Sequence, residues 1–433
     1  MSSERASPLY RQDLGDGLVL RWATEKDTDH VAHLFGNLWS SAEHEPPNPR
    51  PMDQIQRHMR GDFPLTTPDN CALVENTRDP AHPIVSCAFL WHLQWAYEGI
   101  PFSVGQPEMV ATDAAFRHRG LVRHVFELLH ARSAAQGHLV QAITGIYFFY
   151  RQFGYEYALD LGGKRSIYTA LIPPAKQTDP EPYRLREATR ADIPSIMQLY
   201  NLRQATSLVW TLIPQSYWEY VIDQWSHPST QGKDATLLGI NDRIFMLIGE
   251  DGSTLGYIII ATKRWGSDLS IYAFEAVPEV NLRALILPLL RLLDAYGKNI
   301  PFVRPDPEPL REISFCLGRS HPLYTALGQT LTPHQEPPYA WYIRVPDIAA
   351  FIRHIAPALE QRVSASVVAG YAGELKLSFY SSGLRLVFNQ GRLISLEAWD
   401  PPADESLPDA GCPALIFIQL IFGYRSLDDL RAI

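Results

Sequence analysis

The feature of this sequence that most constrains its fold is an internal repeat. The stretches LRWATEKDTDHVAHLF (residues 20–35) and LREATRADIPSIMQLY (residues 185–200) align without gaps at an offset of 165, with six identical positions. Each stretch predicts a short strand, a Thr or Asp cap and an amphipathic helix. At 433 residues the chain is also longer than one hydrophobic core usually serves. The repeat therefore indicates an internal duplication of one α/β unit.

Two proline-rich segments divide the chain into three blocks. IPPAKQTDPEP (residues 172–182) and TPHQEPPY (residues 332–339) predict linkers, because proline fixes φ and removes a backbone donor. We therefore expect domains at residues 1–172, 183–331 and 339–433.

Composition and charge exclude several classes of protein. The net charge of −9 argues against a nucleic-acid-binding protein, which needs Lys and Arg to neutralise phosphates, and mildly favours a cationic partner. There is no run of about 18 apolar residues, so no membrane span is expected, and the start MSSERASPLY has no secretory h-region. The four cysteines lie far apart without a CxxC pair. We therefore expect no disulfide framework, no metal site and a reducing cytoplasmic location.

A basic cluster surrounds a glycine at the start of a predicted helix, in AFRHRGLVRHVF (residues 115–126). The first N–H groups of a helix are unpaired, and the helix dipole adds positive charge there. Gly120 lets a ligand approach the backbone, and Arg117, Arg119 and Arg123 can grip phosphates. These properties predict a pyrophosphate site. The alternative is a solvated basic helix end, although basic residues there oppose the dipole.

Two motifs in this region carry a family resemblance. RHRGLV (residues 117–122) resembles the acetyl-CoA-binding pattern R/Q-x-x-G-x-G/A of GNAT acetyltransferases, but Val122 takes the place of the last small residue. IYFFYRQFGYEYA (residues 146–158) follows, with the pattern YxxFGY. With its duplicated block and a third C-terminal block, the chain resembles GNAT proteins of the enhanced intracellular survival (Eis) type. The resemblance implies an α/β fold with a catalytic GNAT domain (1–172), a degenerate second GNAT domain (183–331) and a sterol carrier protein-like domain (339–433).

The resemblance also implies acetyl-CoA as co-substrate and assigns residues to it. A splayed strand would present its backbone to the pantetheine arm, the loop into the helix would cradle the pyrophosphate, and the end of the next strand would close the other side. The implied set is Val110, Ala111, Thr112, Arg117, His118, Arg119, Gly120, Leu121, Val122, Arg123, Gly145 and Ile146.

Three residues are candidates for catalysis. The family's tyrosine acid corresponds to Tyr150, since a phenol with a pKa of about 10 can protonate a leaving thiolate at neutral pH; the alternative is a core aromatic. Glu108 is a candidate base, because strand alternation places it on the face of Val110 and Thr112; the alternative is an ordinary exposed carboxylate. In the family the terminal carboxylate enters the site, which implies Ile433 here, although the family usually continues beyond this point.

The acceptor wall is expected in the segment after the first helix (residues 38–54), where Trp39, Glu43 and Glu45 suit a cationic amine; a polar loop is the alternative. The family's aminoglycosides are permitted, and polyamines or lysine side chains remain open. The corresponding helix of the second copy lacks the R-x-x-G motif and has Glu279 near its start, so we expect it to bind no CoA.

Two functions are compatible with these residues. The first is an acetyl-CoA-dependent N-acetyltransferase acting on a primary amine, as a homo-oligomer, hexameric by resemblance. The second is a non-enzymatic protein that binds a lipid or a small molecule on the same scaffold. Arg117, Gly120 and Tyr150 favour the first, whereas Val122 and the degenerate second copy favour the second.

Overall fold

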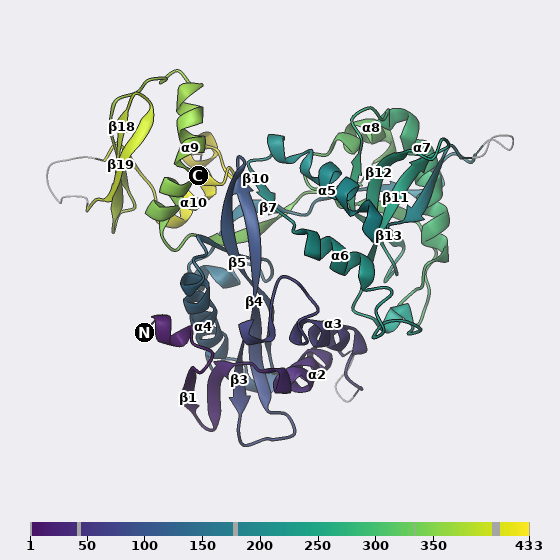
Figure 1. Cartoon of the computed structure of the whole chain (residues 1–433), viewed down its shortest axis with the longest axis horizontal. Helices are drawn as coiled ribbons and strands as arrows, with labels where there is room; N and C mark the ends of the chain where they lie inside the picture. Colours follow the sequence, from purple (N-terminus) through teal and green to yellow (C-terminus); the bar gives the residue numbers. More distant parts are fainter. Residues whose placement is uncertain (1, 41–44, 176–180, 333, 401–407, 433) are drawn as a thin grey trace.

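The computed structural model describes residues 2–40, 45–175, 181–332, 334–400 and 408–432 and contains three lobes (Figure 1). Within these ranges the lobes are built on sheets of nine, seven and four strands. In Figure 1 the N-terminal lobe lies at the bottom, the middle lobe at the upper right and the C-terminal lobe at the upper left. Helices pack on sheets that contain both parallel and antiparallel pairs. The predicted α/β class is confirmed.

The N-terminal lobe has helices on both faces of its sheet. In β3, Cys71 and Leu73 face a core shared with α2 and α3, whereas Ala72 and Val74 face a core shared with α4. A strand buried on both faces reads as a continuous apolar run, as CALV does here. The strands, in spatial order, are β1 (Arg11–Gly15), β2 (Leu18–Trp22), β3 (Cys71–Asn76), β4 (Ile84–Tyr97), β5 (Ile100–Thr112), β6 (Val140–Ile143), β16 (Tyr339–Arg344) and β7 (Glu156–Leu161), with β10 (Val209–Thr211) beside β4; the helices are α1 (Ser2–Arg5), α2 (Thr28–Leu38), α3 (Pro49–Met59) and α4 (Leu121–Ala135).

Within the described ranges, the middle lobe carries a second sheet with four helices. Its strands, in spatial order, are β15 (His334–Glu336), β8 (Lys164–Tyr168), β14 (Glu312–Phe315), β13 (Asp268–Ala276), β12 (Thr254–Ala261), β11 (Asp242–Gly249) and β9 (Tyr183–Glu187). Its helices are α5 (Ile193–Asn201), α6 (Gln215–Asp223), α7 (Leu282–Asn299) and α8 (Pro322–Leu331). The C-terminal lobe has β19 (Arg392–Ala398), β18 (Gly383–Asn389), β17 (Gly373–Ser378) and β20 (Ala410–Gly411), with α9 (Ile348–Ser364), α10 (Ala414–Ile421) and α11 (Leu427–Arg431).

The two repeated stretches fold in the same way. In the first, β2 leads through a short 3-10 turn into α2, and in the second, β9 leads through a similar turn into α5. Arg21 donates two hydrogen bonds to Asp27 (2.7 and 2.9 Å), and Arg186 donates two to Asp192 (2.7 and 3.0 Å). The threonine three residues before each aspartate donates its backbone N–H to that carboxylate at 2.8 Å. The predicted strand, cap and helix are confirmed in both stretches.

The matched pairs differ in burial, which gives a first prediction. The Arg21 side chain is 15% exposed and also binds Glu75 at 2.8 Å, whereas that of Arg186 is 38% exposed. Removing one partner of a buried ion pair costs about 3–5 kcal/mol, and an exposed pair contributes about 0–1 kcal/mol. We expect Arg21→Met to lower the free energy of opening of α2 by about 3 kcal/mol, and Arg186→Met to affect α5 by less than half of that. Hydrogen exchange measures the free energy of opening of each helix separately. Equal decreases for α2 and α5 would contradict this ranking.

Two strands cross the boundaries expected between the blocks. β8 lies near the end of the expected first domain (1–172), but it pairs with β14 and β15 of the middle sheet. β16 lies at the start of the expected third domain (339–433), but it inserts between β6 and β7 of the N-terminal sheet. Each strand pairs on both of its edges, which satisfies its backbone groups more fully than an edge position would. The connecting segments therefore tie the three lobes together.

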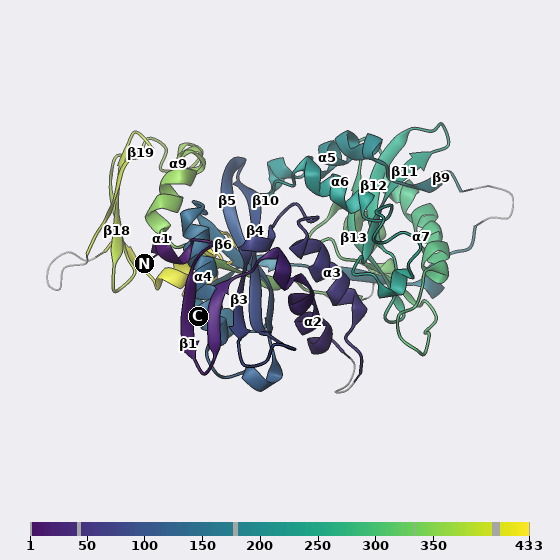
Figure 2. The ribbon, with the colours of Figure 1, turned by 60° about the horizontal axis from the view of Figure 1, so that its bottom comes forward.

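The long hairpin of β4 and β5 extends from the N-terminal lobe between the other two lobes (Figures 1 and 2). Near its tip, Tyr97 and Phe102 pack edge-on against Phe351 of α9, with ring centroids 6.1 and 5.5 Å apart. On the other side, β10 of the middle block pairs with β4. The hairpin is therefore in contact with all three blocks.

No helix in the described ranges is both long enough and apolar enough to cross a bilayer.

Candidate functional site

A cleft opens in the N-terminal lobe where β5 and β6 separate. The two strands pair in parallel only at Val104–Val140 and Gly105–Gln141, and β5 then continues alone on this side to Thr112. A cavity of about 680 Å³ lies between them, which we call the first cavity. It is lined by Leu38, Trp39, Val110, Ala111, Thr112, Phe116, Arg117, His118, Gly120, Leu121, Val122, Arg123, Ile146, Phe149, Tyr150, Gln152 and Phe153.

A bulge shapes the end of β5. Met109 and Val110 stand together opposite the single residue Ala88, and Met109 has a φ of 54°. A bulge adds a residue to one strand, so side chains no longer alternate across it. The alternation that put Glu108 on one face with Val110 and Thr112 therefore does not hold, because Thr112 lines the first cavity and Glu108 a different one.

The mouth of the first cavity is the N-terminal end of α4. Gly120 is its N-cap with a φ of 75°, and a Cβ added there would meet no atom within 4 Å. Among the described residues, no acceptor is bound to the backbone N–H groups of residues 118–122. Free N–H groups at the positive end of a helix dipole form an anion site. The loop thus offers free donors to an anion, and the pyrophosphate site stays a prediction.

Three guanidinium groups surround this mouth. Arg123 donates a hydrogen bond to Gln152 Oε1 (3.1 Å), and Arg119 lies over the ring of Phe116 at 5.0 Å. Arg117 is exposed on the cavity wall. Within the described ranges, the ion pairs of α4 involve other basic residues, so these three arginines have no carboxylate partner. Aromatic and amide contacts hold guanidinium groups without neutralising them, and their charge stays available to an anion.

Tyr150 lies at the inner end of the first cavity, in the 3-10 turn Phe149–Phe153. Its ring stacks on Phe126 at 5.6 Å, and its hydroxyl lies 3.5 Å from the position of a Cβ on Gly145. Burial raises the pKa of Tyr150, and the nearby Glu108 carboxylate raises it further. No hydrogen bond from this hydroxyl to a described residue is formed. Tyr150 is therefore a protonated, uncommitted donor at neutral pH.

Two tyrosines that no sequence motif singles out hold the loop beside Tyr150. Tyr342 of β16 donates a hydrogen bond to the Ile146 carbonyl (2.8 Å), and the Phe148 N–H donates to the Tyr157 hydroxyl (2.8 Å). The two hydroxyls are 2.7 Å apart. Tyr342 reaches this loop only because β16 inserts between β6 and β7. No local sequence signal connects residues so far apart along the chain.

A second cavity of about 480 Å³ adjoins the first, since Trp39 and Val110 line both. It lies between the N-terminal and middle lobes. Gln106 donates a hydrogen bond to Glu108 Oε1 (2.6 Å) on its wall, and burial raises the pKa of Glu108. Its lining residues are Phe35, Trp39, Asn48, Arg50, Pro51, Gln54, Glu108, Met109, Val110, Gly239, Asn241 and Trp265.

The raised pKa of Glu108 gives a prediction for stability. A carboxyl whose pKa is higher in the folded than in the unfolded state stabilises the fold at low pH, and this contribution is lost as pH rises through the folded pKa. We therefore expect Glu108→Gln to raise the melting temperature at pH 8, with a gain that shrinks toward pH 4. Glu45 is exposed, so Glu45→Gln is the control and should leave the melting temperature unchanged at both pH 8 and pH 4. A lower melting temperature for Glu108→Gln at pH 8 would contradict the assignment.

The remaining predicted residues take different positions. Trp39 is half exposed and stacks on Phe35, whereas Glu45 is exposed and lines neither cavity. Arg119 and Gly145 are next to the first cavity, which they contact through Phe116 and Tyr150. Glu43 and Ile433 lie outside the described residues. Helix α11, which ends shortly before Ile433, lines neither cavity. The described residues contain no group of three or more His, Cys, Asp or Glu placed to hold a metal ion.

Comparison with known families identifies one match. Residues 20–158 match the model of the acetyltransferase (GNAT) domain. Every residue that lines the first cavity falls within this range. No curated protein matches the sequence of the chain closely enough to count as a relative.

Solved structures with a similar fold cover nearly the whole chain. A GCN5-related N-acetyltransferase from Kribbella flavida is 17% identical with a TM-score of 0.58, and one from Anabaena variabilis ATCC 29413 is 12% identical with a TM-score of 0.59. Eis1 from Mycobacterium abscessus is 11% identical with a TM-score of 0.55. Each alignment covers 96% of this chain and 92% of the other. At these identities the likeness shows a shared fold.

Proposed function

We propose that this protein is an N-acetyltransferase that transfers an acetyl group from acetyl-CoA, bound in the first cavity, to a primary amine held in the second cavity. The observation that carries the proposal is the mouth of α4. There, the N–H groups of residues 118–122 have no acceptor among the described residues, and two arginines without a carboxylate partner, Arg117 and Arg123, line a cleft between two separated strands. The GNAT domain match over the same residues supports it.

The residues supply the two proton transfers that amine acetylation needs. The amine nitrogen forms a bond to the thioester carbonyl carbon, and the carbon–sulfur bond breaks. Glu108, whose pKa is raised by burial, accepts the proton that leaves the nitrogen. Tyr150 donates its proton to the leaving thiolate and regains one from solvent, and Glu108 releases to solvent the proton that it accepted. The products are an N-acetylated amine and CoA with a free thiol.

Residues around the reacting centre hold these groups in place. Val110, next to the bulge at Met109, lines both cavities, and we infer that its backbone N–H stabilises negative charge on the carbonyl oxygen there. The hydroxyls of Tyr157 and Tyr342 fix the loop that carries Ile146 and Phe148. We infer that the C-terminal block contributes to the site through Tyr342 rather than through a sterol-binding function of its own.

The middle lobe has the features of a degenerate copy that binds no acetyl-CoA. At the start of α7, the Asn281 side chain accepts hydrogen bonds from the N–H groups of Arg283 and Ala284 (3.1 and 3.3 Å). These amides are thus satisfied within the protein, unlike those at α4. Gly239, Asn241 and Trp265 of this lobe instead complete the second cavity.

Calorimetry tests this proposal directly. We expect acetyl-CoA to bind with a stoichiometry of one molecule per chain, because the first turn of α4 presents free amides and that of α7 is capped. Two equivalent sites per chain would contradict the degenerate role of the middle lobe. No binding at all would contradict the proposed function, and the binding-protein alternative would then be preferred.

A further inference from the structure

We propose that the acceptor amine also carries a carboxylate, and that Arg50 is the residue that selects it. This inference rests on the proposed acetyl transfer, because it treats the second cavity as the acceptor site. The class expected from the sequence was a small cationic amine or a lysine side chain, and this inference adds a carboxylate to the acceptor.

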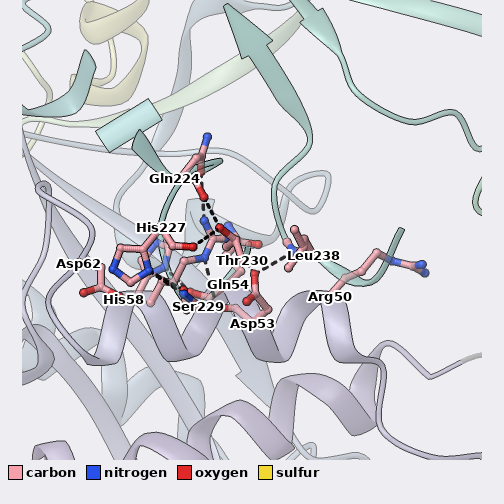
Figure 3. Close-up of polar contacts among 12 residues, drawn as sticks. Arg50, Asp53, Gln54, His58, Asp62, Gln224, His227, Ser229, Thr230 and Leu238 are labelled. Carbon is pink, nitrogen blue, oxygen red and sulfur yellow. Dashed lines mark hydrogen bonds and ion pairs between the residues drawn. The ribbon is translucent and has the colours of Figure 1, made fainter. Parts of the chain in front are cut away.

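Arg50 is a cation without a carboxylate partner among the described residues. It lies in the first turn of α3, is half buried and lines the second cavity. Its side chain donates a hydrogen bond from Nη1 to the Thr236 carbonyl (3.2 Å). Asp53, on the same helix, is already bound by Arg57 (3.0 Å) and by the Gly239 N–H (3.0 Å). Figure 3 shows the Arg50 side chain extending away from the contacts around Asp53, with its guanidinium at the far end.

The charges on the wall of the second cavity are complementary to an acceptor that carries one positive and one negative group. Among the described lining residues, Glu108 is the one acidic group and Arg50 the one basic group. The Lys263 amine, bonded to the carbonyls of Ala235 and Leu238, does not line the cavity; burial lowers its pKa to about 8, and the nearby Arg50 cation lowers it further. A polycation would meet a single carboxylate here and would be repelled by Arg50. An amine near Glu108 and a carboxylate near Arg50 would both be paired.

The shape of the cavity indicates the rest of the acceptor. Phe35, Trp39 and Trp265 give it aromatic walls, and its volume of about 480 Å³ is enough to hold a molecule of amino-acid size. A single guanidinium pairs with one carboxylate through two parallel hydrogen bonds, whereas a phosphate dianion would keep uncompensated charge. The geometry therefore favours an amino-acid-like amine with an aromatic or apolar body.

Binding measurements on the full chain saturated with CoA test the inference without relying on turnover. The probes are two matched pairs that differ only in the carboxylate: phenylalanine with phenethylamine, and 4-(aminomethyl)benzoate with benzylamine. In the wild type, we expect the carboxylate member of at least one pair to bind about tenfold tighter than its partner. Arg50→Gln should remove this preference, and Arg50→Lys should keep part of it because the charge remains.

Arg60→Gln is the matched control for Arg50→Gln. Arg60 lies at the C-terminal end of the same helix and outside the cavity, so its loss should leave the carboxylate preference unchanged. The inference would be overturned if neither carboxylate probe binds the wild type better than its partner. It would also be overturned if Arg50→Gln keeps the same carboxylate preference as the wild type. A carboxylate preference in a protein that acetylates no amine would instead contradict the proposed function. Acetylation of both members of each pair with equal kcat/KM would contradict only the role of Arg50.

Discussion

Gly120→Glu is expected to abolish the binding of acetyl-CoA. The Cβ of residue 120 would point into open space at the mouth of α4, so a carboxylate there would stand among the free N–H groups of residues 118–122. The carboxylate would occupy the proposed phosphate site and repel the phosphate electrostatically. At about 100 times its dissociation constant, acetyl-CoA should stabilise the wild type by roughly 2.7 kcal/mol, and the variant by nothing measurable. Thermal unfolding with and without acetyl-CoA provides the measurement.

Gly120→Gln is the matched control for that experiment. It imposes the same strain at a φ of 75° and nearly the same volume, but it carries no charge. We therefore expect Gly120→Gln to bind acetyl-CoA more weakly than the wild type and much more tightly than Gly120→Glu. Equal losses in the two variants would mean that the backbone conformation, rather than charge, decides binding. Wild-type affinity in Gly120→Glu would show that the anion binds elsewhere.

Tyr150→Phe is expected to lower kcat by about 100- to 10,000-fold, which is the usual contribution of a positioned general acid. Its pKa is raised by burial, so the phenol is protonated at neutral pH and faces the first cavity without an acceptor among the described residues. The phenylalanine keeps the stack on Phe126, and the dissociation constant for acetyl-CoA should stay within about twofold. Release of the CoA thiol, followed with an amine acceptor, measures this effect.

Tyr155→Phe is the control for Tyr150→Phe. Tyr155 belongs to the same aromatic cluster and is fully buried, but its hydroxyl contacts His130 (2.9 Å) rather than the cavity. Its loss removes a buried hydrogen bond and should cost about 1 kcal/mol of stability with little change in kcat. If Tyr150→Phe turns over as fast as the wild type, the proton must come from another group and the proposed mechanism is wrong.

The parts of the site that lie close together in the sequence were predictable from it. The R-x-x-G motif fixes a strand, a tight turn and a helix within a few residues, and the structure has this order from β5 to α4. The repeat predicted two equivalent strand–cap–helix units, because its identical Arg, Thr and Asp interact mainly with one another and with nearby backbone. Local interactions of this kind leave a sequence signal.

The parts that depend on distant segments were not predictable. The bulge at Met109 broke the alternation used to orient Glu108, and no glycine or proline at that position announces it. The second cavity needs residues from the middle lobe, such as Trp265, and Arg50 was not selected because a single arginine in a proline-rich segment carries no motif. Tyr342 reaches the first sheet only through the insertion of β16. Each of these features follows from how distant segments pack.

The most direct test of acetyl transfer is to incubate the wild-type protein with acetyl-CoA and a mixture of primary amines and to follow both by mass spectrometry. We predict that each molecule of free CoA thiol appears with one molecule of N-acetylated amine, and that Tyr150→Phe and Gly120→Glu both suppress this product. Acetyl-CoA that binds but remains intact with every amine would contradict acetyl transfer and favour the non-enzymatic binding protein.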